Sequence, residues 1–329
     1  MTKSDRIHYL DIAKGIGIYL VVLGHVTHSE WLWYYIWQFH MPLFFFISGL
    51  LYIPKDSFKT FLIKRTKSLY IPYVIFFLIT FAYWVLIERK YRGFEIPISY
   101  ELIGLPYGTY EGGHLFFNGV LWFLPCLYAT EIIFYFIAKL KDRIGIFAGI
   151  ICSFAIGQFL LLNRVDYLPF GLNTAFNAIL FYGIGYLLKP FFIHLNNKNK
   201  KHQILFLIGC LAIQLLYLGK YVSNIKVCTV PYCFLAFAGI GFYLILSNLL
   251  NNNKAIEYFG RNSLVILGLH APIMRAIIFI TATITHISTE ALRQNVYVSI
   301  VLSLLILITM IPFINSWRRF VWSSFFLKQ

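Results

Sequence analysis

The chain has 329 residues, of which 59% are hydrophobic and only 12% are charged. So much apolar surface excludes a water-soluble globular domain and predicts an integral membrane protein with many spans. The formal net charge of +15 does not indicate a nucleic-acid-binding protein, because the Lys and Arg residues lie in short connections between apolar runs and form no basic domain.

Ten apolar runs near 20 residues long predict an all-α bundle of about ten transmembrane helices, which forms a single domain over residues 1–329. With the N-terminus placed in the cytoplasm, the connections on that side carry 19 Lys and Arg residues, and those on the other side carry 7. This bias predicts that both termini are cytoplasmic. The expected spans are approximately residues 9–27, 32–53, 69–87, 116–138, 144–162, 170–188, 204–218, 227–250, 263–284 and 296–314.

The first span has an ionisable residue near each end, Lys14 and His25. Eleven residues of helix separate these positions by about 16 Å, and eleven steps of about 100° end about 20° past three full turns. Both side chains are therefore expected on one face of the helix, Lys14 near the cytoplasmic leaflet and His25 near the outer one. Because ionisable groups inside a bilayer are costly, this stripe predicts a ligand that lies along the helix.

Each residue of this stripe also has a structural interpretation. Asp11 and Lys14 are three residues apart and can form an ion pair, so Asp11 is expected to support Lys14. His25 can accept a proton near neutral pH, or it can simply bond to a neighbouring helix. Gly15 and Gly17 indicate a close approach of another helix or of a ligand.

The second span contains Pro42, which predicts a bend that frees backbone carbonyls. Such carbonyls need partners in a membrane. His40 lies two residues earlier, where it either satisfies this backbone or contacts substrate. The sequence leaves both interpretations open.

The basic cluster Lys-Arg-Thr-Lys precedes the third span at residues 64–67. It either fixes the topology and contacts lipid phosphates, or binds the phosphates of a soluble anionic ligand. For the second role Arg65 is the better candidate, because its guanidinium group is a planar fork of donors.

The fourth span contains Leu-Trp-Phe-Leu-Pro, in which Trp122 and Pro125 are expected beside a second bend. The same span embeds a carboxylate, Glu131, whose structural interpretation is an ion pair with a basic residue on another helix. His114 lies just before this span, on the outer side, where it can touch an extracytoplasmic substrate.

The ninth span is expected to begin at a cap formed by Asn262 and Ser263, and it carries His270 in its interior. Elsewhere no signature of a soluble enzyme is present, since the chain has no Walker A loop, HExxH or GxSxG motif. The five cysteines have no CxxC spacing and are expected to be packing thiols, so neither a disulfide framework nor a metal site is predicted.

Taken together and in order, these motifs resemble the acyltransferase-3 family of integral membrane acyltransferases. The first span has a basic residue and a histidine with ten residues between them, Lys14 and His25. The later features are Pro-Leu-Phe-Phe-Phe-Ile-Ser-Gly, Lys-Arg followed by Leu-Tyr-Ile-Pro-Tyr, Leu-Trp-Phe-Leu-Pro, and Asn-Ser-Leu followed by His270. The string Asp-Ile-Ala-Lys-Gly-Ile-Gly-Ile is similar to the branch described as fucose O-acetylase-like, although much of the family has Arg where this chain has Lys14.

The resemblance implies transfer of an acyl group, usually acetyl from acetyl-CoA, to carbohydrate outside the cytoplasm. We therefore expect Lys14 and Arg65 to bind the phosphates of acetyl-CoA. His25 is expected either to deprotonate a sugar hydroxyl or to carry the acetyl group itself. No metal is required, because a thioester is already activated. The residues expected to bind substrate are His40, Ser48, His114, Trp122 and His270.

The expected partners are membrane lipid, acetyl-CoA and an extracytoplasmic or lipid-linked glycan, in a multi-pass protein of a bacterial inner membrane. The alternative is a transporter or flippase of lipid-linked sugars, which also needs many spans, kinked helices and buried ions. The sequence indicates no oligomeric state.

Overall fold

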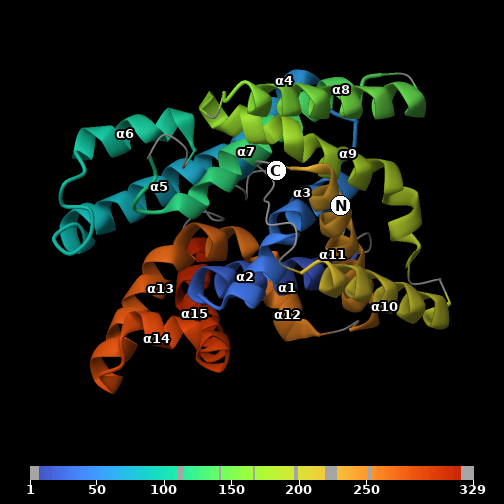
Figure 1. Cartoon of the computed structure of the whole chain (residues 1–329). Helices are drawn as coiled ribbons and strands as arrows, with labels where there is room; N and C mark the ends of the chain where they lie inside the picture. Colours follow the sequence, from blue (N-terminus) through green and yellow to red (C-terminus); the bar gives the residue numbers. More distant parts are fainter. Residues whose placement is uncertain are drawn as a thin grey trace. The chain divides into compact units, whose positions relative to one another are not determined.

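A computed structural model of the chain describes residues 7–109, 114–140, 142–165, 167–195, 199–218, 228–250 and 253–319. Within these residues every regular element is a helix, which confirms the predicted all-α class (Figure 1). Eight of the described helices are long and apolar enough to cross a membrane. Several basic residues that contribute to the predicted charge bias, among them Lys198, Lys220 and Lys226, lie outside the described residues.

The chain divides into two compact units. The first comprises Met1–His40, Lys198–Lys220 and Gly241–Gln329, and the second comprises Met41–Asn197 and Tyr221–Ile240. Two helices, α3 (His40–Leu51) and α11 (Val230–Leu249), begin in one unit and end in the other.

In the first unit, α1 packs against α12 most extensively, and also against α2, α13 and α15. The helices α13 and α15 lie side by side and are joined through the short α14, as the orange and red part of Figure 1 shows. Of the eight candidate spans, α1 is the most completely buried. The helices of this unit are α1 (His8–Val26), α2 (Glu30–Trp37), α10 (Lys200–Leu216), α12 (Lys254–Arg261), α13 (Ser263–Thr285), α14 (Thr289–Gln294) and α15 (Val296–Trp317).

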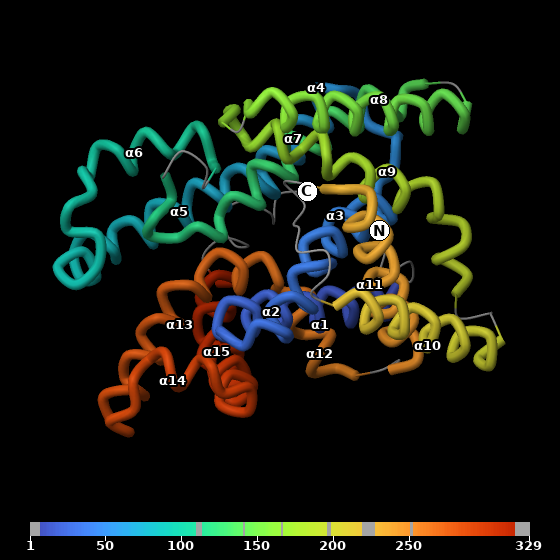
Figure 2. The backbone as a smooth tube through the Cα atoms, viewed as in Figure 1, coloured from blue at the N-terminus to red at the C-terminus, as the bar shows by residue number. Residues whose placement is uncertain are grey.

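In the second unit, α9 packs along both α7 and α8, which can be followed in the tube of Figure 2. On α8 the terminal side chains Ile144 and Leu162 are 79% and 81% exposed, as expected for an apolar helix whose outer face meets lipid. The helices of this unit are α4 (Phe58–Arg65), η2 (Thr66–Tyr70), α5 (Ile71–Tyr83), η3 (Trp84–Glu88), α6 (Ile98–Tyr107), η5 (Gly119–Trp122), α7 (Phe123–Ile137), α8 (Arg143–Leu162), η6 (Pro169–Gly171) and α9 (Leu172–Ile193).

The predicted third span is the central part of one continuous helix, Phe58–Glu88, which has 31 residues. It consists of α4, η2, α5 and η3, and the segments η2 and η3 are π-helical. A π-helical turn holds one residue more than an α-helical turn, so each of these segments changes the register of the side chains that follow it. Arg65 lies at the first of these transitions.

Two of the ten predicted spans differ from the helices that the structure contains. The span predicted at residues 204–218 corresponds to α10, which has 17 residues and is shorter than the candidate spans. The span predicted at residues 32–53 is divided into α2 and α3, because a turn at Gln38 and Phe39 interrupts the helix. The predicted bend at Pro42 is therefore wrong in position, because Pro42 lies in the first turn of α3, where a missing N–H leaves no helical bond unmade.

Pro125 also lies in the first turn of its helix, because it is the third residue of α7 and follows the 3-10 turn η5. Its ring packs against Gly108, where an added Cβ would collide with the proline side chain. The predicted second bend is thus a change from 3-10 to α-helical geometry at the start of the span. Both prolines mark the beginnings of helices.

Candidate active site

His25 lies in the last turn of α1 and is partly exposed, whereas its neighbours Gly24 and Val26 are buried. Its Nδ1 atom is 2.7 Å from the backbone carbonyl oxygen of Val21. A carbonyl oxygen can only accept a hydrogen bond, so Nδ1 must donate and therefore carries the proton of the neutral ring. The Nε2 atom is then a lone-pair acceptor, which is the form that a general base requires.

His270 and His40 repeat this arrangement on their own helices. Nδ1 of His270 donates to the carbonyl of Ile266 at 2.9 Å, and Nδ1 of His40 donates to the carbonyl of Ile36 at 2.9 Å. In each neutral ring Nε2 is again the acceptor. The sequence placed these two histidines in separate spans, and both lie in the first unit together with His25.

His25 and His270 are in direct ring contact. Their ring centroids are 5.4 Å apart, and the rings meet edge to face at 73°. The His270 side chain is fully buried, and its Nε2 atom has no hydrogen-bond partner within the described part of the chain. A buried acceptor without a partner is uncommon in a folded protein, and it indicates a position that a ligand or a water completes.

Trp37, on α2, contacts two of these histidines. Its ring centroid is 5.8 Å from that of His25 and 5.3 Å from that of His40, and it stacks on Trp33 at 4.7 Å. The indole N–H lies 3.5 Å from the carbonyl of Gly24, next to His25. The indole therefore fixes one side of the imidazole of His25.

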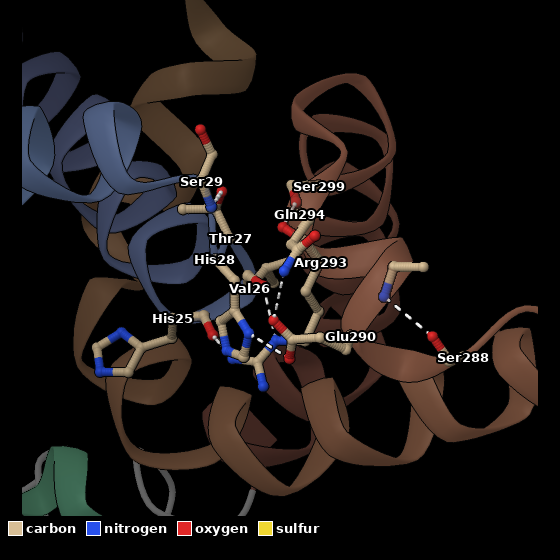
Figure 3. A network of polar contacts seen from close by, with 11 residues as sticks. His25, Val26, Thr27, His28, Ser29, Ser288, Glu290, Arg293, Gln294 and Ser299 are labelled. Carbon is tan, nitrogen blue, oxygen red and sulfur yellow. Dashed lines mark hydrogen bonds and ion pairs between the residues drawn. The ribbon is translucent and has the colours of Figure 1, made fainter.

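The backbone at the end of α1 is held by Arg293, which follows α13 in the chain (Figure 3). Its Nη2 donates to the carbonyl of His25 at 2.7 Å, and its Nε donates to the carbonyl of Val26 at 2.9 Å. The last carbonyls of a helix have no partner within the helix, and a cation near them also opposes the helix dipole. Arg293 therefore caps α1 at its candidate catalytic residue.

The surrounding contacts fix Arg293 itself, as Figure 3 shows. Its carbonyl accepts from the backbone N–H of His28 at 2.8 Å and from Oγ of Ser299 at 3.0 Å. Nδ1 of His28 also contacts a carboxylate oxygen of Glu290 at 2.7 Å, and this bond lowers the pKa of Glu290. The segment after His25 is thus tied to α14 at several points.

At the other end of α1, Lys14 and Asp11 form the predicted ion pair, with 2.7 Å between Nζ and Oδ1. The Asp11 side chain is almost fully buried, whereas that of Lys14 is 23% exposed. Arg261 of α12 approaches the second carboxylate oxygen of Asp11 at 3.5 Å and pairs with Glu257 on its own helix. The predicted pairing of Asp11 with Lys14 is confirmed. Arg261 is a second cation beside Asp11, which further supports the structural interpretation of this carboxylate.

The close approach predicted at Gly15 is made by α12. A Cβ added to Gly15 would collide with the backbone carbonyl of Ile256, and one added to Gly260 would collide with the carbonyl of Asp11. The two helices are in backbone contact, which glycine alone permits here. This contact brings Arg261 to Asp11.

In the second unit, Arg65 pairs with Glu131, and 2.8 Å separates Nε from Oε2. Glu131 is buried and Arg65 is partly exposed above the ring of Phe61. The structural interpretation of Glu131, an ion pair with a basic residue on another helix, is confirmed. The guanidinium of Arg65 has four further N–H bonds besides the one at Nε.

The three remaining predicted substrate residues also lie in the second unit. His114 is buried against the rings of Tyr100 and Tyr107, and its Nδ1 contacts the carbonyl of Tyr100 at 2.9 Å. Trp122 ends η5, and Ser48 lies within α3; both are partly exposed.

His25 thus lies at the end of a buried helix, three turns beyond the basic residue Lys14. Comparison with known proteins shows the family to which this chain belongs. A family model described as an acyltransferase domain, Acyl_transf_3, matches residues 7–317. The chain belongs to the acyltransferase-3 family. This acyltransferase-3 protein is accordingly a multi-pass membrane acyltransferase, and the family implies an acyl donor and an acceptor. The comparisons with curated proteins and with solved structures found no match.

Three residues near the candidate site of this acyltransferase-3 chain could not be identified from the sequence. Trp37 was indistinguishable from other tryptophans near a membrane surface, and Arg293 was counted only as a charge in an outer connection. Arg261 is the last residue of the amphipathic helix α12, and only the glycines at 15 and 260 signal the close helix contact that brings it to Asp11. All three depend on tertiary contacts.

Proposed function

We propose that this protein transfers an acetyl group from acetyl-CoA to a hydroxyl of an extracytoplasmic or lipid-linked sugar, in a bacterial inner membrane, with His25 as the general base. The supporting observation is the bond from Nδ1 of His25 to Val21, which leaves Nε2 as the acceptor on a partly exposed ring. The family supplies the reaction type, acyl transfer.

In the proposed reaction, Nε2 of His25 removes the proton from a sugar hydroxyl while that oxygen attacks the thioester carbonyl. The carbon–sulfur bond then breaks, and the CoA thiolate takes the proton back from the imidazolium. If Nε2 attacks the thioester first, the carbon–sulfur bond breaks, CoA leaves as the thiolate and His25 carries the acetyl group as an acetyl-imidazolium. The sugar hydroxyl then attacks the acetyl carbon, its proton passes to the CoA thiolate, and the carbon–nitrogen bond breaks to restore the imidazole. Both routes need the same nitrogen of the same histidine.

Lys14 and Arg65 are proposed to bind the phosphates of acetyl-CoA. Each cation is anchored by a buried carboxylate, Asp11 or Glu131, and each keeps part of its side chain exposed. With both termini in the cytoplasm, both cations belong to the side on which acetyl-CoA is made, and His25 to the opposite side. The long pantetheine arm is suited to bridge the distance of about 16 Å between the levels of Lys14 and His25.

The other predicted site residues complete the proposal. His40 and His270 are proposed to bind the acceptor beside His25, since all three histidines lie in one unit and present the same tautomer. Ser48, His114 and Trp122, which belong to the second unit, are also proposed to contact substrate, and the proposed reaction uses no metal.

The test uses the purified full-length protein in lipid vesicles, with radiolabelled acetyl-CoA and a panel of methyl glycosides. We expect His25→Gln to lower transfer by at least about 100-fold, the scale of a lost general base. His202→Gln, an identical change at an exposed position on α10, is the matched control. Normal transfer by His25→Gln would overturn the assignment, and movement of unmodified glycan without acetyl-CoA would support a transporter instead.

A further inference from the structure

Nε2 of His270 lacks a hydrogen-bond partner within the described residues, and this indicates which groups the sugar substrate must supply. We infer that His25 and His270 together recognise two adjacent hydroxyls of the sugar, a vicinal diol, with one hydroxyl donating to each imidazole. This inference rests on the proposed function and adds the class of acceptor that the site takes.

The hydrogen bonds of His270 determine its tautomer. Its Nδ1 lies 2.9 Å from the carbonyl of Ile266 and 3.1 Å from that of Leu267, so the ring proton is engaged within α13. The Nε2 atom can then only accept a hydrogen bond. Because this atom is buried and has no partner among the residues that the structure describes, the missing partner must be a donor.

His270 is in contact with His25, so two imidazole acceptors lie close together. A single hydroxyl has one proton, so it can donate to one imidazole and leaves the other acceptor unpaired. Two adjacent hydroxyls satisfy both acceptors. The hydroxyl on His25 is the one that reacts, because His25 is partly exposed and can exchange its proton, whereas His270 is fully buried.

The distances allow this arrangement. The two ring centroids are 5.4 Å apart. Each Nε2 lies about 1.2 Å from its ring centre, so the two atoms are at most about 8 Å apart, whichever way the rings are turned. Adjacent sugar oxygens about 3 Å apart, each with a hydrogen bond of about 2.8 Å, span up to about 8 Å. The spacing of the two rings is therefore within the reach of a vicinal diol.

A chemical consequence follows for the product. The hydroxyl on His270 keeps its proton and is not acylated, so each turnover leaves one ester and one free neighbouring hydroxyl. A sugar whose neighbouring hydroxyl is already esterified lacks the second donor. The protein is therefore specific for unsubstituted diols and adds one acetyl group to each.

The experiment compares the best methyl glycoside of the panel with its monodeoxy analogue, which lacks the neighbouring hydroxyl. For the wild-type protein we expect kcat/KM to fall by about tenfold or more on the analogue, as a site built around a hydroxyl discriminates against its absence. His270→Gln keeps an acceptor near the position of Nε2 and should retain this ratio. His270→Phe keeps the ring but removes the acceptor, so the ratio should approach one, and His202→Gln is the control.

The outcomes separate the two proposals. Equal wild-type rates on the glycoside and its monodeoxy analogue would overturn the diol inference, because a water would then suffice at His270, while dependence on His25 would keep the proposed function intact. No transfer to any glycoside would overturn the proposed function itself. If His270→Phe does not fold, the wild-type comparison alone still decides the inference.

Discussion

Nη2 of Arg293 donates to the backbone carbonyl of His25 over 2.7 Å, although the two residues are 268 positions apart in the chain. Nε of the same guanidinium donates to the next carbonyl, that of Val26. A fork of two donors fixes the direction of the last peptide planes of α1. It thereby also fixes the backbone position from which the His25 side chain projects. We therefore expect Arg293 to act as a positioning residue for His25.

Replacement of Arg293 should affect turnover more than donor binding. We expect Arg293→Gln to lower kcat about tenfold or more with little change in the KM for acetyl-CoA, because misorientation of a base acts on the chemical step. Arg293→Lys should recover only part of kcat, since an ammonium lacks the planar fork. Steady-state kinetics on vesicles measure both constants. The exposed Arg164→Gln is the control, and an unchanged kcat in Arg293→Gln would contradict the positioning role.

Substitution of Lys14 distinguishes binding of the acyl donor from a purely structural ion pair with Asp11. If Lys14 binds phosphate, Lys14→Gln should raise the KM for acetyl-CoA about tenfold, with a smaller change in kcat and a modest fall in Tm. The structural interpretation instead predicts a lower Tm and an unchanged KM. Kinetics and thermal unfolding in the same detergent separate the two, with Lys200→Gln on the exposed end of α10 as the control.

The backbone contact between α1 and α12 should be intolerant of a single methyl group. Gly15→Ala and Gly260→Ala each direct a Cβ at a carbonyl of the other helix, and overpacking of this kind costs about 1–3 kcal/mol or more. Gly209→Ala on α10 is the matched control, since an added Cβ there meets nothing within 4 Å. It should be neutral or stabilising by up to about 1 kcal/mol. Thermal unfolding and size-exclusion profiles measure the effect, and an unchanged Tm in both contact variants would refute it.

Arg65 and Glu131 should be energetically coupled. Glu131→Gln leaves the cation without its carboxylate, and Arg65→Gln leaves a buried carboxylate without its cation, so each single change should destabilise the protein. The double variant should lose less than the sum, with a coupling of about 1–3 kcal/mol. Reversible unfolding of the four proteins gives this value, and strict additivity would show that the pair contributes nothing.

Glu101, in α6, should make stability depend on pH. Burial raises its pKa to about 7, although its carboxylate accepts a bond of 3.1 Å from the N–H of Phe116. The folded protein thus binds this proton more tightly than the unfolded chain. The contribution to stability is complete below about pH 4.5 and is lost as pH rises to about 7, with a total of at most about 3 kcal/mol.

Unfolding measured between pH 4.5 and 8 tests this dependence. Glu101→Gln should flatten the slope between pH 4.5 and 7, whereas Glu95→Gln, at an exposed position nearby, should leave it unchanged. The same slope in Glu101→Gln and the wild type would place the titrating group elsewhere.

Features that depend on composition or local spacing were predictable from the sequence. Apolar runs predicted the helical spans, and the spacing of Asp11 and Lys14 predicted their pair, because helix geometry alone brings such residues together. An embedded carboxylate such as Glu131 requires a cation. The sequence could not name Arg65 as that cation, since the pairing joins residues far apart in the chain.

Features that depend on competition between local and tertiary interactions were not predictable. Asn262 stands at the predicted start of α13, yet its side-chain amide donates back to the carbonyl of Tyr258 at 2.6 Å and makes no capping bond. The break at Gln38 and Phe39 has no proline or glycine to signal it. The convergence of His25 with His270 requires packing that no local pattern encodes.

The helix Phe58–Glu88 is longer than a bilayer is thick. Its 31 residues extend about 46 Å, against about 30 Å of hydrocarbon. Even a tilt of 40°, at the upper end of the usual range, leaves several ångströms protruding. The end that begins at Phe58 carries Lys59, Lys64 and Lys67, so we expect this end to extend into the lipid headgroups. The pair of Arg65 and Glu131 would then lie near the water boundary, where the guanidinium can meet a dissolved anion outside the hydrocarbon core.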